Sequence, residues 1–144
     1  MTSDTYLILH GPNLNLLGER EPTVYGTLTQ DDILHRVAEV SGKDIELFQS
    51  NHEGTLIDTL HEARNRYAGV LFNPGAYSHY SYALYDAIRA IDVPVVEVHL
   101  SDITAREEFR KISVTAPACI AQYYGMGIEG YEKGIIRLIE EAGE

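Results

Sequence analysis

The sequence is poor in cysteine and in positive charge. Cys119 is the single cysteine among 144 residues, so no intramolecular disulfide can form, and a reducing compartment is the simplest expectation. Lys and Arg number 11 against 22 Asp and Glu, which gives a formal net charge of -11. A surface that binds nucleic acid needs many basic side chains, so nucleic acid is not an expected partner. An anionic substrate would have to be bound by local arginines against the overall field.

Long apolar runs are also missing. The first residues, MTSDTYLILHGPN, contain no basic segment and only a short apolar run. We therefore expect neither a signal peptide nor a membrane-spanning helix, and we expect a cytoplasmic protein that does not contact membranes. No linker, low-complexity tract or repeat interrupts the chain, which predicts one domain over residues 1–144.

Short apolar runs alternate with helical patterns along the whole chain. Strands are expected at residues 6–10, 45–49, 70–72, 93–98 and 117–122. Helices are expected from Thr29 to Gly42, around 56–63 and 83–91, over a short stretch at 105–110, and at 131–141. Strands without polar alternation that are separated by helices indicate a parallel sheet covered on both faces. The sequence thus predicts an α/β fold of the flavodoxin-like, doubly wound type, with a five-stranded parallel sheet and helices on both faces.

Ligands of such sheets bind beyond the carboxyl ends of the strands. The segment GPNLNLLGEREPTVYG, residues 11–26, is long for a strand-to-helix loop and has glycines near its centre and at both ends, as lids often do. Polar residues follow the first, third and fourth expected strands, and we expect them to meet at one edge of the sheet. They are Asn13, Arg20 and Tyr25; Asn73 and His79; and Glu97, His99, Ser101, Arg106 and Arg110.

Each of these groups could also have a purely structural role. Arg20 could form surface ion pairs, Tyr25 could pack with its hydroxyl in water, and His79 could cap a helix. Glu97 and His99 lie two residues apart on a strand, so they point to the same face and could simply hydrogen-bond each other. Convergence of the three groups at one sheet edge favours a functional site.

Several common chemistries lack their motifs. The chain contains no G-x-G-x-x-G after its first strand, no P-loop, no zinc-type Cys or His spacing and no G-x-S-x-G elbow. The third strand ends in Asn73, where a phosphate-accepting receiver would need an acidic residue. Glu97 with His79 and His99 could in principle bind a metal, but the neighbouring arginines would oppose a cation. We expect no metal and no cofactor, and we expect Cys119 to be an inert core residue of an apolar strand.

Acid–base chemistry by tyrosine, histidine and arginine is the remaining option. A phenol has a pKa near 10, so a tyrosine base must lose about two to three units, which corresponds to roughly 3–4 kcal/mol. Guanidinium groups favour the phenolate, and Arg20 is close to Tyr25 in sequence while Arg110 could approach it in space. The same arginines can bind a carboxylate.

Five segments carry a resemblance to a known family. GPNLNLLGEREPTVYG, QSNHEG, FNPGAYSHYS, VPVVEVHLS and AREEFR occur in order across nearly the whole chain, and together they resemble the type II 3-dehydroquinate dehydratases. The resemblance implies a cofactor-free lyase that converts 3-dehydroquinate to 3-dehydroshikimate and water. In that family a tyrosinate removes a proton alpha to the ketone to give an enolate, and a histidine protonates the departing hydroxyl in an anti elimination.

The resemblance also implies roles for individual residues. Tyr25 would be the base, His99 the acid, Arg20 the group that lowers the tyrosine pKa, and Asn13 the residue that positions water or the enolate oxygen. The substrate's carboxylate and hydroxyls would be bound by Asn73, His79, Leu100, Ser101 and Arg110, with Asp86 reaching into a neighbouring subunit's site. Glu97 would orient His99, and Glu21 and Arg106 would support the site from behind. Trimers of the chain would assemble into a dodecamer.

Besides the dehydratase, two other functions stay open on the sequence alone. A flavodoxin-like module could bind a small anion without turning it over, and a metal-dependent hydrolase is a third possibility. The type I dehydroquinases are excluded, since a (β/α)8 barrel needs about 250 residues. They also use a Schiff-base lysine, and none of Lys43, Lys111 and Lys133 lies in an apolar run that would depress an amine pKa. The same reaction could serve aromatic biosynthesis or quinate breakdown.

Overall fold

The fold is built around a five-stranded sheet, which is seen in the computed structural model describing residues 3–19 and 27–143. The strands are β1 (Thr5–His10), β2 (Asp44–Gln49), β3 (Gly69–Asn73), β4 (Val95–Val98) and β5 (Ala121–Tyr123). Their order is β2-β1-β3-β4-β5, and every neighbouring pair is parallel. The predicted α/β class and the parallel sheet are confirmed.

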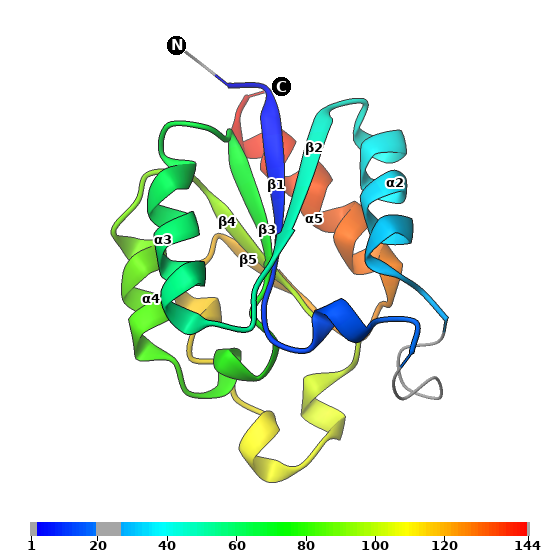
Figure 1. Cartoon of the computed structure of the whole chain (residues 1–144), viewed down its shortest axis with the longest axis vertical. Helices are drawn as coiled ribbons and strands as arrows, with labels where there is room; N and C mark the ends of the chain where they lie inside the picture. The colour runs from blue at the N-terminus through cyan, green and yellow to red at the C-terminus, as the bar shows by residue number, and fades with distance from the viewer. Residues whose placement is uncertain (1–2, 20–26, 144) are drawn as a thin grey trace.

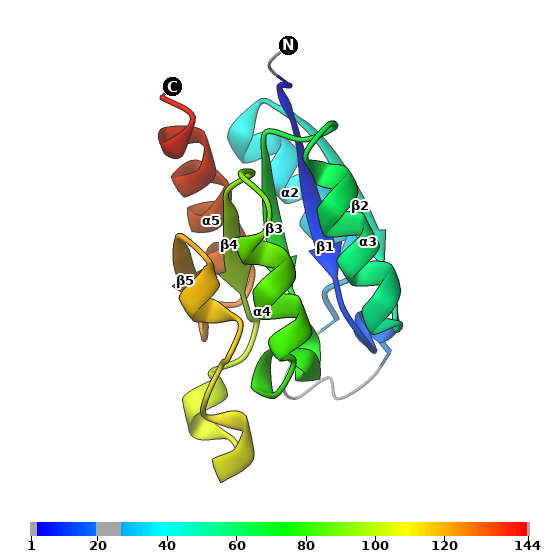
Figure 2. The same ribbon diagram turned by 90° about the vertical axis from the view of Figure 1, so that its left-hand side faces the viewer.

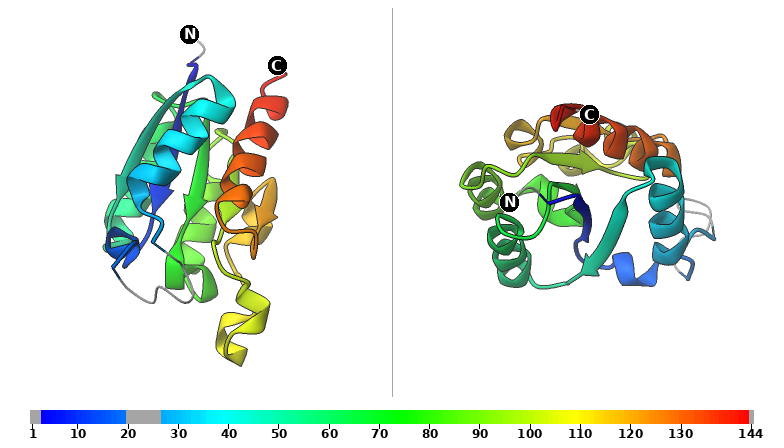
Figure 3. Two further views of the ribbon diagram at one scale, coloured as in Figure 1. Left: turned by 90° about the vertical axis from the view of Figure 1, so that its right-hand side faces the viewer. Right: turned by 90° about the horizontal axis from the view of Figure 1, so that it is seen from above.

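Two pairs of helices cover the two faces of the sheet (Figures 1 and 3). The helices α2 (Gln30–Ser41) and α5 (Ile128–Glu141) lie on one face, and α3 (Glu53–Ala63) and α4 (Tyr82–Arg89) lie on the other. In β1, Tyr6 and Ile8 pack toward the first pair, whereas Leu7 and Leu9 pack toward the second. Alternation along a strand thus buries both faces, which explains the apolar run at residues 6–9 of β1.

The first long helix begins and ends where its sequence predicts. The Thr29 hydroxyl accepts a hydrogen bond from the Asp32 N–H, and the Asp32 carboxylate accepts one from the Thr29 N–H, which together form a capping box. Gly42 ends the helix with φ 68°, a conformation that glycine adopts without steric cost. Leu28 and Leu34 pack at the border of the same core.

Several predicted boundaries were wrong near the carboxyl half of the chain, and the last helix begins at Ile128 rather than at Tyr131. The expected helix at 105–110 is two separate 3-10 turns, η3 (Ile103–Ala105) and η4 (Glu108–Arg110), because Arg106 between them is extended (φ -100°, ψ -166°). The fourth strand begins at Val95, after Pro94, and not at Val93.

The fifth strand begins at Ala121 rather than at Pro117. Pro117 lies in a further 3-10 turn, η5 (Ala116–Ala118), where its fixed φ is tolerated and its missing N–H costs no ladder bond. Cys119 therefore follows this turn and is not part of a strand, although it is half-buried against the core as expected. Burial raises the pKa of its thiol, which makes it a poor nucleophile.

The loops after β1 and β3 are locked together at the carboxyl edge of the sheet. The Gly11 N–H donates to the Asn73 carbonyl at 2.8 Å, and a Cβ on Gly11 would lie 2.3 Å from the Pro74 oxygen. Gly75 has φ 63° and packs on the Pro12 carbonyl. Only glycine permits this approach at both positions.

The segment that carries η3 and η4 extends beyond the same edge of the sheet (Figure 2). Among the described residues, no helix is long and apolar enough to cross a membrane.

Candidate active site

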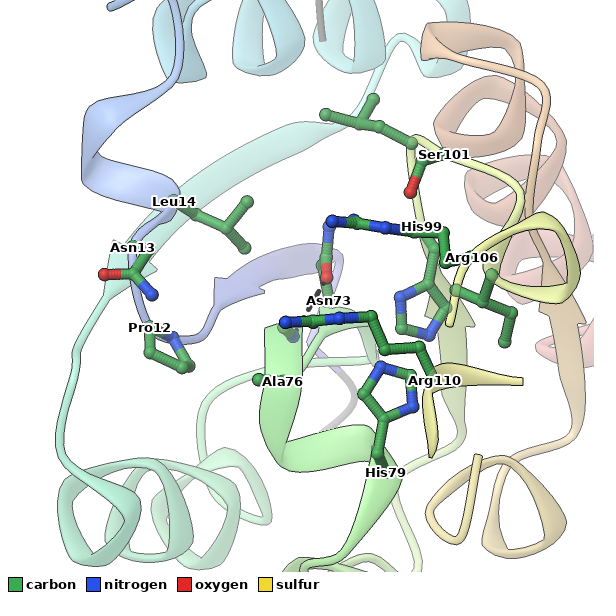
Figure 4. Close-up of a pocket in the computed structure, with 13 residues that line it drawn as sticks. Pro12, Asn13, Leu14, Asn73, Ala76, His79, His99, Ser101, Arg106 and Arg110 are labelled. Atoms are coloured by element: carbon green, nitrogen blue, oxygen red, sulfur yellow. Dashed lines mark hydrogen bonds between the residues drawn. The ribbon is translucent and has the colours of Figure 1, made fainter. Parts of the chain in front are cut away.

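A cavity of about 130 Å³ lies at the carboxyl ends of β1, β3 and β4. Figure 4 shows polar side chains from three separate loops pointing into it. The described residues that line it are Pro12, Asn13, Leu14, Asn73, Gly75, Ala76, His79, His99, Leu100, Ser101, Ile103, Arg106 and Arg110. The predicted meeting of the residues after the first, third and fourth strands is therefore observed.

Asn13 has the left-handed backbone conformation, with φ 71° and ψ -5°. It is the single non-glycine residue with positive φ in the described ranges. Its N–H donates to the Asn51 side chain at 2.9 Å, and its carbonyl accepts from the Leu16 N–H at 3.0 Å. Asparagine tolerates this conformation better than most residues, and the contacts hold it beside the cavity.

Glu97 and His99 form a buried pair. Glu97 lies inside β4 with 0% of its surface exposed, and His99 follows the strand with 6% exposed. The distance between His99 Nε2 and Glu97 Oε2 is 2.7 Å. The hydrogen bond expected from their spacing on the strand is thus present.

Three other side chains also donate to Glu97. They are the hydroxyls of Ser113 and Thr115 and the amide of Gln122, with distances of 2.6 Å for Ser113 and 3.0 Å for Gln122. Burial raises the pKa of Glu97, but the donors from His99, Ser113 and Thr115 outweigh it and hold the pKa below its ordinary value. The carboxyl group is therefore an anion near neutral pH.

The charge on Glu97 decides the tautomer of His99. A carboxylate can only accept, so Nε2 of His99 must carry the hydrogen in this contact. The ring's other nitrogen, Nδ1, is then left for a ligand in the cavity, because Glu97 itself does not line that cavity. The Glu97 carboxylate orients the ring, and this arrangement suits the transfer of a proton between Nδ1 and a ligand oxygen.

His79 faces the same cavity from the loop after β3. Its Nδ1 donates to the Ile112 carbonyl at 2.9 Å, which fixes the ring against the segment formed by residues 103–112. Burial lowers the pKa of His79, and nearby His99 and Arg110 lower it further. His79 is therefore neutral near pH 7 and suits hydrogen bonding rather than charge pairing.

Two half-buried arginines, Arg106 and Arg110, line the side of the cavity formed by the 103–112 segment (Figure 4). Arg110 Nε lies 2.8 Å from the Glu107 carboxylate, and its guanidinium lies 5.1 Å from the centre of the Phe109 ring. A guanidinium next to histidines and an amide is suited to bind a carboxylate ligand.

Leu100 and Ser101 connect the pair to this segment. Their carbonyls accept hydrogen bonds from the N–H groups of Gly127 and Gly125 at 3.2 and 3.0 Å, which anchors the loop. Asp102 follows, and its carboxylate caps η3 by accepting from the Thr104 N–H at 2.9 Å. The loop's position is thus set by the distant segment 125–127 and by a local cap at Thr104.

The outcome for the predicted site residues falls into three groups. Eight line one cavity: Asn13, Asn73, His79, His99, Leu100, Ser101, Arg106 and Arg110. Glu97 lies directly behind His99, and Asp86 is exposed on α4 outside this cavity, so its role in a neighbouring subunit stays a prediction. Arg20, Glu21 and Tyr25 lie outside the described residues.

Sequence reasoning missed the residues that hold Glu97. Ser113, Thr115 and Gln122 come from beyond the 103–112 segment, 16 to 25 residues after Glu97. No local pattern marks them, because a buried carboxylate can recruit donors from any loop that passes it. The one available signal was the need of a buried Glu97 for several donors.

Comparison with known proteins identifies the family. The family model for dehydroquinase class II matches residues 4–139. A 3-dehydroquinate dehydratase from Bacillus pumilus is 55% identical over 141 residues, covering 96% of each chain. The chain belongs to the class II dehydroquinase family.

Solved structures of the family share the fold. A type II dehydroquinase from Butyrivibrio crossotus superimposes with a TM-score of 0.89 at 42% identity, covering 95% of this chain and 98% of that one. A second, from Propionibacterium acnes, gives 0.86 at 39% identity and covers 99% of both chains. The resemblance inferred from the five sequence segments is confirmed. No group of three or more His, Cys, Asp or Glu is placed to hold a metal ion within residues 3–19 and 27–143.

Proposed function

We propose that this class II dehydroquinase removes water from 3-dehydroquinate to give 3-dehydroshikimate, without a cofactor. The observation that carries the proposal is the Glu97–His99 pair, with its 2.7 Å contact, at the bottom of a cavity that Arg106 and Arg110 flank. Such a site offers a proton donor beside groups that bind an anionic, hydroxyl-bearing substrate. Curated relatives that are 51–58% identical to the chain are named 3-dehydroquinate dehydratase.

The first step is proton removal at the carbon alpha to the ketone. We assign it to the tyrosinate of Tyr25, with the Arg20 guanidinium lowering the tyrosine pKa, as the family resemblance implies. The electron pair of the broken C–H bond moves to the ketone oxygen and gives an enolate. Asn13, held beside the cavity in its left-handed conformation, positions the enolate oxygen or a water.

The second step is departure of the hydroxyl. His99 gives a proton from Nδ1 to the leaving oxygen, the C–O bond breaks, and the enolate electrons form the C=C bond conjugated with the ketone. Water is released. Tyr25 then gives up the proton that it took from carbon, and His99 takes up a proton, so both residues return to their starting states. Glu97 stabilises His99 while it is charged, which matches the depressed pKa of the carboxyl group.

Binding of the substrate would use the other cavity residues. Arg110 would pair with the carboxylate, while Asn73, His79 and the Leu100–Ser101 loop would bind the hydroxyls; all of them line the cavity. Asp86 would contribute to a neighbouring subunit's site in a dodecamer built from trimers. The enzyme would act in the cytoplasm, in the shikimate pathway or in quinate catabolism.

The test is turnover of purified 3-dehydroquinate, followed by the ultraviolet absorbance of the conjugated enone. We expect product formation that neither sodium borohydride nor a metal chelator abolishes. Borohydride inactivation would indicate an imine, and chelator inactivation would indicate a metal enzyme. Thermal stabilisation by dehydroquinate without any enone would favour the alternative, a flavodoxin-like anion-binding module.

A further inference from the structure

A chain of buried hydrogen bonds runs behind Asn73 and away from the cavity. The Asn73 side-chain nitrogen, Nδ2, lies 3.2 Å from the Tyr131 hydroxyl, which lies 2.8 Å from His10 Nε2. His10 Nδ1 lies 2.7 Å from Gln30 Oε1. The four residues come from β3, α5, β1 and the first turn of α2, and His10, Tyr131 and Asn73 are at most 4% exposed.

With the Gln30 amide oriented as it is in the structure, the hydrogen bonds of this chain run in one direction. The Gln30 oxygen accepts from His10 Nδ1–H, so a neutral His10 presents the lone pair of Nε2 to Tyr131. The Tyr131 hydroxyl donates to that lone pair, and its oxygen accepts from Asn73 Nδ2–H. Burial supports the neutral state, since it lowers the pKa of His10 to about 4.

The other end of the Asn73 amide is fixed as well. Its oxygen accepts from the Gly75 N–H at 3.1 Å. An amide turned by 180° would place its NH2 group against the Gly75 N–H and its oxygen against the acceptor side of Tyr131, so both contacts would be lost. One hydrogen of Nδ2 is used by Tyr131, and the second has no partner in the part of the chain that the structure describes.

We propose that Tyr131 and His10 are positioning residues that hold the Asn73 amide so that its second N–H is offered to a substrate oxygen. Asn73 lines the cavity, whereas neither Tyr131 nor His10 does, so both act only through Asn73. The inference rests on the proposed function, because the oxygen acceptor is a hydroxyl or carboxylate oxygen of 3-dehydroquinate.

A merely structural role makes a different prediction. Hydrogen bonds that only satisfy buried polar atoms would change the melting temperature but not the kinetics of the folded enzyme. The positioning role requires a kinetic change that depends on the presence of Asn73.

The experiment measures kcat and KM for 3-dehydroquinate with Tyr131→Phe, alone and in an Asn73→Ala background. We expect kcat/KM to fall about tenfold in the single variant, the size of one hydrogen bond, and to change less than about twofold when Asn73 is already Ala. Tyr67→Phe is the matched control, since the Tyr67 hydroxyl donates to Glu46 at 2.6 Å and neither residue lines the cavity. Its kinetics should equal those of the wild type.

A second pair of variants keeps the inference testable if Tyr131→Phe fails to fold. His10→Leu removes the acceptor for Tyr131 and should lower kcat/KM like Tyr131→Phe, whereas His10→Gln retains an acceptor and should restore most of the activity. Unchanged kinetics in Tyr131→Phe and His10→Leu, or the same loss with and without Asn73, would overturn the inference while the proposed function stands. A wild type that does not turn over 3-dehydroquinate would overturn both.

Discussion

The two sides of the cavity are built in different ways. The floor consists of Asn73 and His99, with Glu97 directly behind His99; all three are buried and lie at the ends of the central strands β3 and β4. The rim, residues 103–112, consists of two short 3-10 turns that extend beyond the sheet (Figure 2). Floor side chains are held by hydrogen bonds from distant parts of the chain, while rim ion pairs are local, as in Arg110–Glu107 and Lys111–Glu108.

This difference separates two tasks. A proton donor must keep its geometry and its tautomer, and burial with several partners provides both. Arginines that bind an anion can exchange a local carboxylate, such as Glu107, for the carboxylate of a substrate. We therefore expect floor substitutions to lower kcat and rim substitutions to raise KM.

The largest effect is expected for His99→Asn. Loss of a positioned general acid lowers kcat by about 10²- to 10⁴-fold, with KM close to that of the wild type. Steady-state kinetics and far-ultraviolet circular dichroism would check this. The control is His61→Asn, which alters an exposed histidine on α3, and equal kcat values in both variants would contradict the assignment.

Arg110→Ala should have the next largest effect, on the other side of the comparison. A charged hydrogen bond contributes about 1.5–3 kcal/mol, so we expect KM to rise roughly 10- to 150-fold with a much smaller change in kcat. Arg137→Ala is the control, because Arg137 pairs with Glu141 on α5, remote from the cavity. A fall in kcat with an unchanged KM would show that the rim takes part in the chemistry.

Glu97→Gln keeps the shape of the floor but removes its charge. Without the carboxylate, the His99 imidazolium loses its counter-charge, and we expect kcat to fall on the order of 10- to 100-fold, as for other groups that orient a functional histidine. Glu46→Gln, which alters a carboxylate exposed on β2, should keep wild-type kinetics. Wild-type kcat in Glu97→Gln would reduce Glu97 to a structural role.

Buried His10 should also make the free energy of unfolding depend on pH. The folded pKa of His10 is about 4, below its ordinary value of 6.5, so between these values the unfolded chain binds the extra proton. The contribution of neutral His10 to the free energy of unfolding is therefore complete above pH 6.5. It falls with the pH, by about 2 kcal/mol at pH 5.

Urea unfolding at pH 7 and pH 5 would measure this loss. His10→Gln should lose less stability than the wild type over this interval, whereas Lys111→Gln, which removes a rim ion pair, should keep the wild-type difference. The same loss in all three proteins would show that His10 does not account for it.

How far the sequence predicts the molecule depends on the range of the interactions. Parallel strands and the capped helix from Thr29 to Gly42 follow from local periodicity and capping residues, so they were predicted. The meeting of Asn73, His79 and His99 follows from strand ends sharing one edge. The hydrogen bonds to Glu97 and the Tyr131–His10 contact join residues far apart in sequence, and no local sequence pattern predicts them.

The errors have the same origin. Residues 105–110 contain good helix formers, but Arg106 is extended because the segment follows the cavity wall instead of packing an apolar face. At 117–122, the apolar composition suggested a strand, whereas Pro117 and the η5 turn delay pairing until Ala121. The predicted roles of Arg20, Glu21 and Tyr25 came from motif resemblance and stay predictions.

The division between floor and rim is tested most directly by binding of 3-dehydroquinate to protein that cannot turn it over. Isothermal titration calorimetry on His99→Asn, with and without Arg110→Ala, measures this at equilibrium. We predict that His99→Asn binds 3-dehydroquinate and that adding Arg110→Ala weakens the affinity roughly 10- to 150-fold. Loss of binding in His99→Asn alone, or equal affinity in the two proteins, would contradict the account.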